Sequence, residues 1–378
     1  MSRYDMGLQE ELENKRKEIR TDSYSMSVGE LLSLYESKEI EIHPEFQRFF
    51  RWSQTQKTRF IESLLIGLPI PQIFVSQRED GIWDVVDGLQ RLSTIYEFAG
   101  ILRDENGKVL PHLTLDAADS LPSLMGKKWD DPSAPKNSLN QTQRLLIKRS
   151  KIEVAILKQE SNPIAKYELF QRLNTGGSIA TDQEIRNCLL IMSNREIFGW
   201  LKELSKNEAF QTCISLSDKA GQEQYDLELL LRFLFFRDMD EEALGKIPYP
   251  DVSEFITRRT IELSKDPELD YEVEKDAFNV TFKILAEQLE DNSFRKYNHQ
   301  KGKFVGGFLV SAFEAVALGI GYHYKEFRDT EVDVVDRVKQ LWLDKRFTSS
   351  LGGSPGGSIS TRKRVQNILP IGRELFQV

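Results

Sequence analysis

The sequence has 378 residues, of which 40% are hydrophobic and 29% are charged. These values are typical of a soluble globular protein with a sizeable core, and the length predicts about two domains. The net charge of -8 argues against a protein that coats nucleic acid with a basic surface, although a local basic groove remains compatible with it.

The sequence has two cysteines, which do not form a CxxC pair and argue against a disulfide framework. Its four histidines are scattered, which argues against a metal centre. We therefore expect no zinc, no haem and a reducing, cytoplasmic location. The N-terminal residues 1–25 are highly charged, which predicts an arm or helix and not a signal peptide. No run of about 18 apolar residues occurs, so we expect no membrane span.

Hydrophobic periodicity predicts an α/β first half. The expected elements, in chain order, are a charged helix over 8–20, a helix over 27–37, a short strand over 40–42, a helix from the capping box at 53–56 to Gly67, strands over 71–75 and 82–86, a helix after Gly88, and a strand over 151–157.

From residue 162 onward long helical patterns dominate, and no strand pattern is evident after residue 160. The helical patterns cover residues 195–206, 223–238, 251–264, 271–290, 304–320 and 330–343. We therefore expect an α/β domain over 26–160 and a helical domain over 161–378, with a Gly/Ser-rich loop over 351–360.

Residues 85–92, VVDGLQRL, place polar side chains at an abrupt change from strand to helix. A helix N-terminus exposes backbone N–H groups, and Gly88 lets an anion approach them closely. Arg91 would then hold a phosphate, Asp87 would bind Mg²⁺ or act as a base, and Gln90 would orient a water. A simpler interpretation makes Asp87 an N-cap, Gly88 a turn residue and Arg91 a surface charge, and spacing alone favours it.

Residues 44–52, PEFQRFFRW, hold Arg48 and Arg51 among four aromatic residues. Arginines between aromatic rings are stiffened and partly desolvated, which suits phosphate binding or base stacking. The alternative is that the aromatic residues belong to the core and the arginines to its rim. The pattern by itself does not decide between them.

Residues 170–177, FQRLNTGG, end a predicted helix in a glycine turn. The chemistry alone favours a corner between two helices with left-handed glycines, while the functional alternative places Asn174 and the glycine backbone at a ligand. No GxxxxGK[ST] motif occurs, which disfavours a Walker-type NTPase. The Gly/Ser-rich segment 351–360 with the basic residues 362–364 could form a phosphate-contacting flap, but a flexible connection is favoured.

The order of these motifs resembles the family typified by the N-terminal domain of the GmrSD type IV restriction enzymes, whose fold is ParB/sulfiredoxin-like. The matching segments are Pro44-Glu45-Phe46-Gln47-Arg48 with Trp52, Gly67-Leu68-Pro69-Ile70-Pro71, Asp87-Gly88-Leu89-Gln90-Arg91, Asn174-Thr175-Gly176-Gly177 and Glu184-Ile185-Arg186-Asn187. The family's Asp-Gly-Gln-Gln-Arg signature has Leu89 in place of its first Gln, and we expect Leu89 to face the core. The resemblance is strong over about 27–200 and implies an α+β fold: a small mixed-sheet domain followed by an all-helical region.

The resemblance implies nucleotide-dependent work on DNA, because members of this family are implicated in NTP hydrolysis and in restriction of foreign DNA. Larger members also carry an HNH-type nuclease region, and no such region is evident in this sequence. We therefore expect a nucleotide, DNA and a nuclease partner subunit as partners, no membrane partner, and a homo-oligomer as one possible assembly.

This hypothesis describes an NTP-binding and hydrolysing protein with Mg²⁺ that gates or senses DNA in phage defence. The expected catalytic residues are Asp87, Gln90, Arg91 and Arg48, and the expected metal ligand is Asp87. The expected phosphate-binding residues are Gln47, Arg48, Arg51, Gly88, Arg91, Asn174 and Gly176.

Two alternatives stay open. The first is a non-catalytic DNA-binding or adaptor module, whose DNA affinity would depend on salt and require no NTP. The second is a direct, Mg²⁺-dependent nicking nuclease at the same site.

Overall fold

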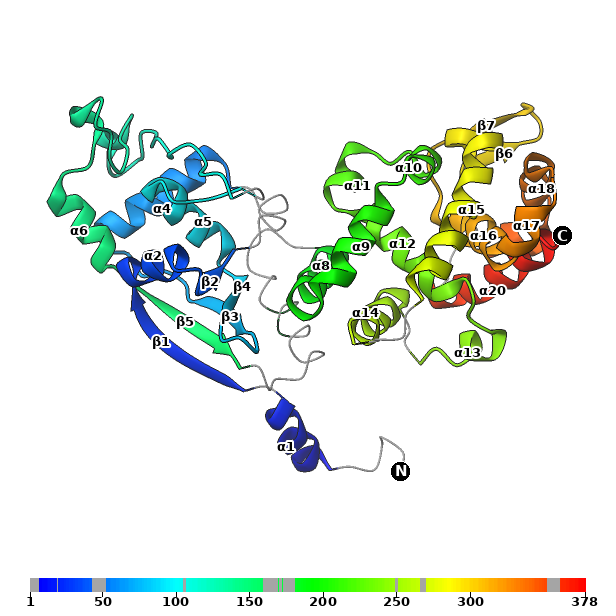
Figure 1. Ribbon diagram of the computed structural model, residues 1–378, viewed down its shortest axis with the longest axis horizontal. Coiled ribbons are helices and arrows are strands. Elements are labelled where there is room, and N and C mark those ends of the chain that lie inside the picture. Colours follow the sequence, from blue (N-terminus) through cyan, green and yellow to red (C-terminus); the bar gives the residue numbers. More distant parts are fainter. Residues whose placement is uncertain are drawn as a thin grey trace. The chain divides into compact units, whose positions relative to one another are not determined.

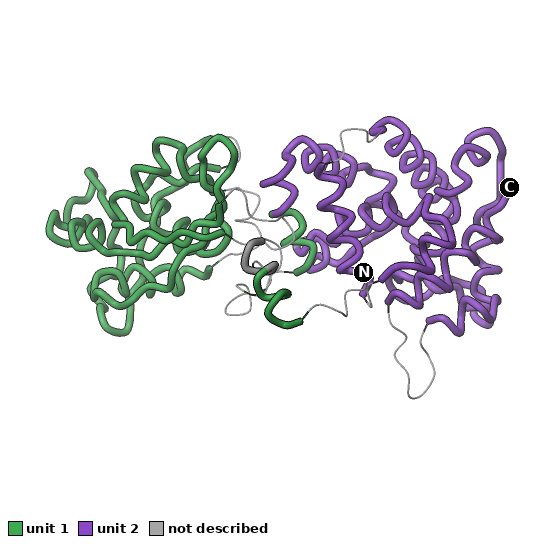
Figure 2. The backbone as a smooth tube through the Cα atoms, turned by 90° about the horizontal axis from the view of Figure 1, so that it is seen from below, with its two compact units in different colours: residues 1–188 green, residues 189–378 purple. Residues whose placement is uncertain are grey.

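The computed structural model describes residues 7–18, 20–42, 52–104, 107–158, 169, 172, 181–248, 251–265, 270–351 and 361–378. The chain divides into two compact units, Met1–Cys188 (unit 1) and Leu189–Val378 (unit 2) (Figure 2). Unit 1 contains a mixed five-stranded sheet and unit 2 is mostly helical, so the α+β prediction is confirmed (Figure 1). Among the described residues, no helix is long and apolar enough to cross a membrane.

Unit 1 combines a sheet with the helices that cover one of its faces. Its elements are α1 (Leu8–Glu18), β1 (Thr21–Ser27), α2 (Val28–Glu36), β2 (Ile40–Glu41), α4 (Gln54–Ile66), β3 (Ile73–Gln77), β4 (Trp83–Asp87), α5 (Leu89–Ala99), α6 (Gln141–Arg149), β5 (Lys151–Leu157) and α8 (Asp182–Ser193), which crosses the division between the units.

The strand order is β1-β5-β3-β4-β2. The β1–β5 and β3–β4 pairs are antiparallel, whereas β3–β5 and β2–β4 are parallel. Alternate residues of the central strands, such as Ile73, Val75 and Val85, are buried, as expected for a sheet that packs helices against one face. Figure 1 shows α2, α4 and α5 on that side of the sheet.

The local signals of the sequence set several of these boundaries. The capping box between Ser53 and Gln56 starts α4 and the left-handed Gly67 ends it, as predicted, and Ser27 caps α2. Strand β1 was not predicted, because its sequence TDSYSMS is polar and mostly exposed. Its pairing with β5 over the whole strand, from Thr21↔Leu157 to Ser27↔Lys151, supplies the hydrogen bonds that a polar edge strand needs.

Unit 2 is built from α9 (Arg195–Ser205), α10 (Glu208–Ile214), α11 (Asp218–Gln222), α12 (Tyr225–Phe236), α13 (Glu241–Gly245), α14 (Val252–Leu263), α15 (Tyr271–Leu289), β6 (Lys296–Asn298), β7 (Lys303–Val305), α16 (Val310–Tyr322), α17 (Tyr324–Asp329), α18 (Val334–Leu341), α19 (Lys345–Ser349) and α20 (Thr361–Leu375). Its core is rich in phenylalanine, with Phe210, Phe233, Phe278, Phe282 and Phe313 fully buried. Helices α16 and α20 cross so closely that a Cβ added at Gly372 would lie only 2.2 Å from the Ala315 carbonyl oxygen.

The β6–β7 hairpin corrects the expectation that no strand follows residue 160. Residues 304–305 were expected to open a helix over 304–320, but they belong to β7, and α16 begins at Val310. Strands of three residues are too short to show a period of two against the helical patterns on both sides.

A buried ion network joins three helices of unit 2. Glu314 of α16 is fully buried, and its carboxylate accepts hydrogen bonds from Arg232 of α12 at 2.8 Å and from Arg364 of α20 at 3.0 Å. Burial opposes the charge of Arg232, yet the carboxylates of Glu228 and Glu314 raise its pKa above the ordinary arginine value. Arg364, one of the three consecutive basic residues at 362–364, therefore has a partner inside the protein.

We predict that Glu314→Gln destabilises unit 2 by about 3–5 kcal/mol, because it removes one member of a buried ion network and leaves the arginines undercompensated. The measurement is urea unfolding followed by far-UV circular dichroism, which the helices dominate. The control is Glu203→Gln, which removes a carboxylate from the exposed Lys206 pair and is expected to cost about 0–1 kcal/mol. Equal effects of the two substitutions would contradict the structural role of Glu314.

Candidate functional site

A one-residue turn connects β4 to α5. Gly88 has a φ of 92°, in the left-handed region that side-chain-bearing residues adopt only with strain. Space is also lacking, because a Cβ at this position would lie 2.7 Å from Cγ1 of the buried Ile73. The glycine therefore places the N-terminus of α5 directly at the carboxyl end of β4.

The first turn of α5 has no capping side chain within the described part of the chain. Gly88 occupies the N-cap position. The simpler interpretation of the sequence, in which Asp87 is the N-cap, is therefore wrong. The Asp87 carboxylate instead accepts a hydrogen bond from Arg91 at 2.7 Å and keeps about one third of its surface exposed. An uncapped N-terminus leaves backbone N–H groups for an anion.

Arg91 is largely enclosed, with 12% of its side chain exposed. Its Nη1 donates to the carbonyl oxygens of Pro71 and Gln72, and its Nη2 donates to Asp87. The Gly67–Pro71 segment that resembles the family motif is thus tied to the β4–α5 turn by the guanidinium. This arrangement excludes the interpretation of Arg91 as a surface charge.

Gln90 ties a second motif to the same turn. Its side-chain oxygen accepts a hydrogen bond from the backbone N–H of Trp52 at 2.9 Å, and the Trp52 ring packs against Phe60 of α4 with centroids 5.4 Å apart. The end of the PEFQRFFRW motif therefore lies at the N-terminus of α5. Leu89, which departs from the family signature, is buried in the core as predicted.

Five of the predicted site residues lie outside the described residues: Gln47, Arg48, Arg51, Asn174 and Gly176. Their contribution to phosphate binding stays a prediction. The structure brings together the other four, Asp87, Gly88, Gln90 and Arg91, within one turn.

A polar cluster that the sequence did not reveal lies beside the site. Glu41 of β2 and Asp84 of β4 are register partners, and Arg78 donates to both carboxylates, to Asp84 through Nε at 2.8 Å. Burial opposes the charge of Arg78, but the two carboxylates, Asp84 first, raise its pKa above the ordinary arginine value. The register of β3 against β4 shifts between Phe74 and Val75, where Asp87 pairs with Phe74 and Asp84 pairs with Ser76. The simple alternation of side chains is therefore interrupted between Asp84 and Asp87. The only sequence signal was a charged residue within an otherwise apolar strand.

The Glu184-Ile185-Arg186-Asn187 motif is buried in α8. A capping box lies at its start, because Thr181 and Glu184 each accept a hydrogen bond from the backbone N–H of the other. Gln183 accepts from Arg186 at 2.9 Å and donates to Asn187 at 2.8 Å. All three of these side chains are buried, so the motif contributes to packing within this helix.

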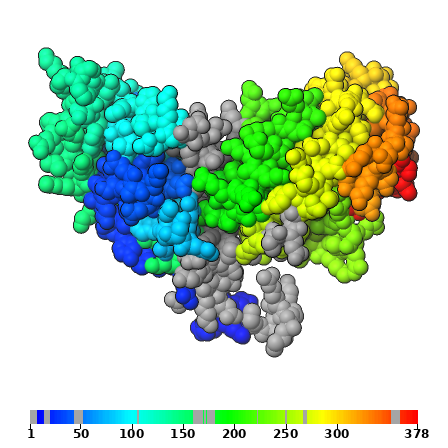
Figure 3. All heavy atoms as spheres, in the orientation of Figure 1, coloured from blue at the N-terminus to red at the C-terminus, as the bar shows by residue number. Residues whose placement is uncertain are grey.

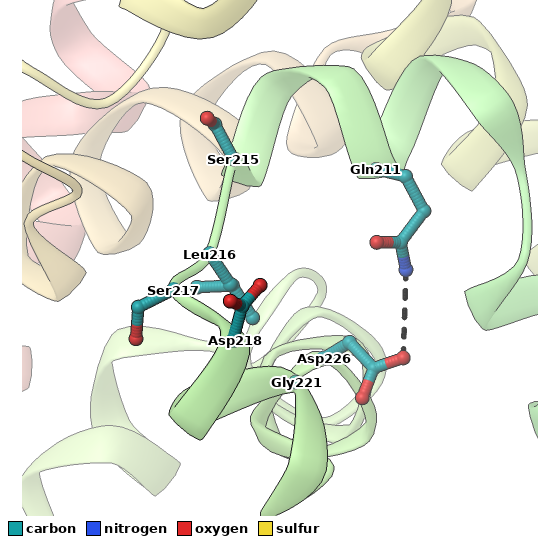
Figure 4. Close-up of a pocket in the computed structure, with 7 residues that line it drawn as sticks. All are labelled: Gln211, Ser215, Leu216, Ser217, Asp218, Gly221 and Asp226. Atoms are coloured by element: carbon teal, nitrogen blue, oxygen red, sulfur yellow. Dashed lines mark hydrogen bonds between the residues drawn. The ribbon is translucent and has the colours of Figure 1, made fainter.

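An open hollow of about 610 Å³ lies at the junction of α10, α11 and α12 in unit 2 (Figure 4). Gln211 points across it to Asp226, at 3.4 Å, and burial raises the pKa of Asp226 above its ordinary value. None of its seven lining residues is basic, and Asp218 adds a second carboxylate. The hollow therefore suits an anionic phosphate poorly, and it contains none of the predicted site residues.

We predict that Gly88→Ala destabilises unit 1 by about 2–5 kcal/mol, because a left-handed alanine costs about 1–2 kcal/mol and forced overpacking about 1–3 kcal/mol. The matched control is Gly81→Ala, since Gly81 has a similar φ of 85° but no neighbouring atom within 4 Å of a new Cβ. Thermal unfolding of both variants separates the two costs. A loss in Gly88→Ala no larger than in Gly81→Ala would show that Ile73 moves aside freely.

Comparison with known proteins found a match in the first part of the chain. Residues 28–191 match the family model described as GmrSD restriction endonuclease, N-terminal domain. No curated protein and no solved structure was found to match the chain. The matched range includes the β4–α5 turn, α4, β3 and most of α8.

Proposed function

We propose that this chain, whose residues 28–191 match the GmrSD N-terminal domain model, is a restriction protein. It would bind an NTP at the β4–α5 turn and hydrolyse it to control work on DNA. The domain type supports the restriction-related role. The observation that carries the nucleotide proposal is the convergence of three sequence motifs on the uncapped N-terminus of α5, through Gln90, Arg91 and Gly88.

The geometry of Gly88 and Arg91 supports phosphate binding. A Cβ added at Gly88 would lie 3.3 Å from Arg91 Nη2, so a phosphate oxygen near the glycine backbone would also be within reach of the guanidinium. The bonds from Nη1 to the carbonyls of Pro71 and Gln72 hold the guanidinium in place. A preorganised arginine loses little side-chain entropy when it binds an anion.

The described residues fit a phosphate-bound magnesium ion better than a protein-held metal. They contain no group of three or more His, Cys, Asp or Glu side chains that would hold a metal. Mg²⁺ in nucleotide sites keeps several waters and uses one or two carboxylates together with the phosphates, and Asp87 supplies one partly exposed carboxylate. When bound, the ion would neutralise phosphate charge.

The role of Asp87 follows from its position at the end of β4. On nucleotide binding, Arg91 Nη2 would exchange the Asp87 carboxylate for a phosphate oxygen, since both are charge-assisted acceptors. The released carboxylate would then hold the magnesium or accept a proton from the attacking water. Arg48, Gln47, Arg51 and Asn174 complete the proposed site on the strength of the family resemblance.

The proposal predicts that Arg91→Ala weakens NTP binding about 10–100-fold, because charge-assisted hydrogen bonds contribute about 1.5–3 kcal/mol. Calorimetric titration with each NTP, with and without Mg²⁺, measures this. The control is Arg59→Ala, which removes an exposed arginine paired with Asp119 in the same unit and should leave binding unchanged. Absence of NTP binding by the unaltered protein, with and without Mg²⁺, would refute the proposal.

For hydrolysis, Asp87→Asn is expected to lower phosphate release about 10²–10⁴-fold, the usual contribution of a positioned acid or base, while NTP binding changes little. Asp119→Asn is the matched control on an exposed carboxylate. Phosphate release is followed with and without duplex DNA. If Asp87→Asn retains full turnover, Asp87 is not part of the catalytic machinery, and if DNA leaves the rate unchanged, hydrolysis is not coupled to DNA.

A further inference from the structure

The β6–β7 hairpin of unit 2 presents a basic tip in an acidic protein. Residues 292–313 contain Arg295, Lys296, Lys301 and Lys303 and no Asp or Glu, whereas the whole chain has a net charge of -8. Figure 1 shows the hairpin at the rim of unit 2 beside α18. In the space-filling view, the segment coloured for residues near 300 lies on the visible surface (Figure 3).

The hairpin is well ordered by its own contacts. Its strands pair from Lys296↔Val305 to Asn298↔Lys303. The turn closes on itself, because the side chain and the carbonyl of Asn298 both accept the Lys301 N–H, and Gly302 adopts a φ of 62°. A turn that is already folded loses little conformational entropy when it binds a partner.

Aromatic residues anchor both ends of the hairpin in the core of unit 2. Phe294 before β6 is almost fully buried and packs against Phe308 and Phe313, with ring centroids 5.7 and 5.2 Å away. Near the tip, Nε2–H of His299 donates a hydrogen bond to the carbonyl oxygen of Lys339 in α18, at 2.9 Å. The base and one side of the hairpin are thus fixed, and its tip extends into solvent.

Three lysines of the hairpin are left for a partner. Lys296, Lys301 and Lys303 are exposed, and none of them forms an ion pair within the described residues. The nearby acids are already used, since Asp291 binds Arg295 at 2.5 Å and Asp336 binds Lys339 at 3.0 Å. Four other exposed lysines of unit 2 pair with acidic neighbours, namely Lys206, Lys219, Lys246 and Lys283. Lys265, Lys275, Lys325 and Lys345 are exposed without an ion pair among the described residues, but they are scattered over different elements.

The chemistry of this surface fits a polyanion with closely spaced charges. A two-stranded β-ribbon is narrow enough to enter a DNA groove, and lysines act as flexible point charges that suit phosphates. The side-chain oxygen of Asn298 is engaged in the turn, and lysine contacts to phosphates position a protein without reading sequence. A backbone contact that is independent of DNA sequence is therefore favoured.

We propose that the β6–β7 hairpin of unit 2 contacts DNA phosphates through Lys296, Lys301 and Lys303. The inference rests on the DNA partner in the proposed function but not on hydrolysis at Asp87. It places a DNA contact on a different unit from the nucleotide site.

The test measures binding of a short fluorescent DNA duplex to the full chain over a range of salt concentrations. In the triple variant Lys296→Glu/Lys301→Glu/Lys303→Glu we expect weaker binding and a shallower slope of log K against log salt. Each lost phosphate contact changes the slope by about 0.9, so three change it by about 2.7. The triple variant with Gln at the same positions should show the same direction of change.

The matched control is Lys206→Glu/Lys219→Glu/Lys246→Glu, which makes the same change in net charge on the same unit. If this variant loses as much affinity and slope as the hairpin variant, the effect is one of overall charge and the inference is overturned. DNA binding by the hairpin variant that equals that of the unaltered protein also overturns it, and points to an acidic protein as the partner of the lysines. If the unaltered protein binds no DNA, the DNA part of the proposed function fails together with the inference.

Discussion

Position 88 admits no side chain, and the geometry of the candidate site depends on this exclusion. The left-handed backbone and the closeness of Ile73 leave room for glycine alone. Because a single residue makes the turn, the carboxyl end of β4 and the N-terminus of α5 are adjacent. Asp87 then reaches Arg91 instead of capping the helix, so a carboxylate, a guanidinium and uncapped backbone N–H groups meet at one point.

The contacts around this turn hold the chain at both ends of the PEFQRFFRW segment. Before the segment, the two-residue strand β2 is held to β4 by backbone pairing and by Arg78, which binds Glu41 and Asp84. At its last residue, the Trp52 N–H donates a hydrogen bond to Gln90. Buried ion pairs such as Arg78–Asp84 contribute little net stability compared with apolar packing, but their geometry is restrictive. We infer that their role is to fix the register of the edge strand that leads into the segment.

Charge in this protein has different roles in different places. Arg364 belongs to a basic bunch in the sequence, yet its guanidinium binds the buried Glu314. The hairpin lysines look less concentrated in the sequence, but folding brings them onto one exposed hairpin whose acidic neighbours Asp291 and Asp336 pair with other cations. The number of basic residues in a segment is therefore a poor guide to an anion-binding surface. Ion pairing and burial decide which cations stay available.

Much of the fold could be read from the sequence because its signals are local. Capping boxes at Ser53 and Thr181, the terminating Gly67, the apolar strands and the buried Leu89 each follow from short-range stereochemistry and periodicity. The motif order also predicted the type of domain. The sequence by itself thus determined where most helices and strands of unit 1 begin and end, and which turn deserved study.

Only the tertiary structure decided which side chains pair with one another. Nothing within residues 87–91 distinguishes an Asp87 that caps a helix from one that binds Arg91, because the choice depends on the Pro71 and Gln72 carbonyls that position the guanidinium. The β6–β7 hairpin escaped prediction because its strands are too short to show a period of two. The polar strand β1 and the Arg78–Glu41 pair escaped it for the same reason as Asp87. Their stability comes from partners distant in the chain, and a local pattern does not record such partners.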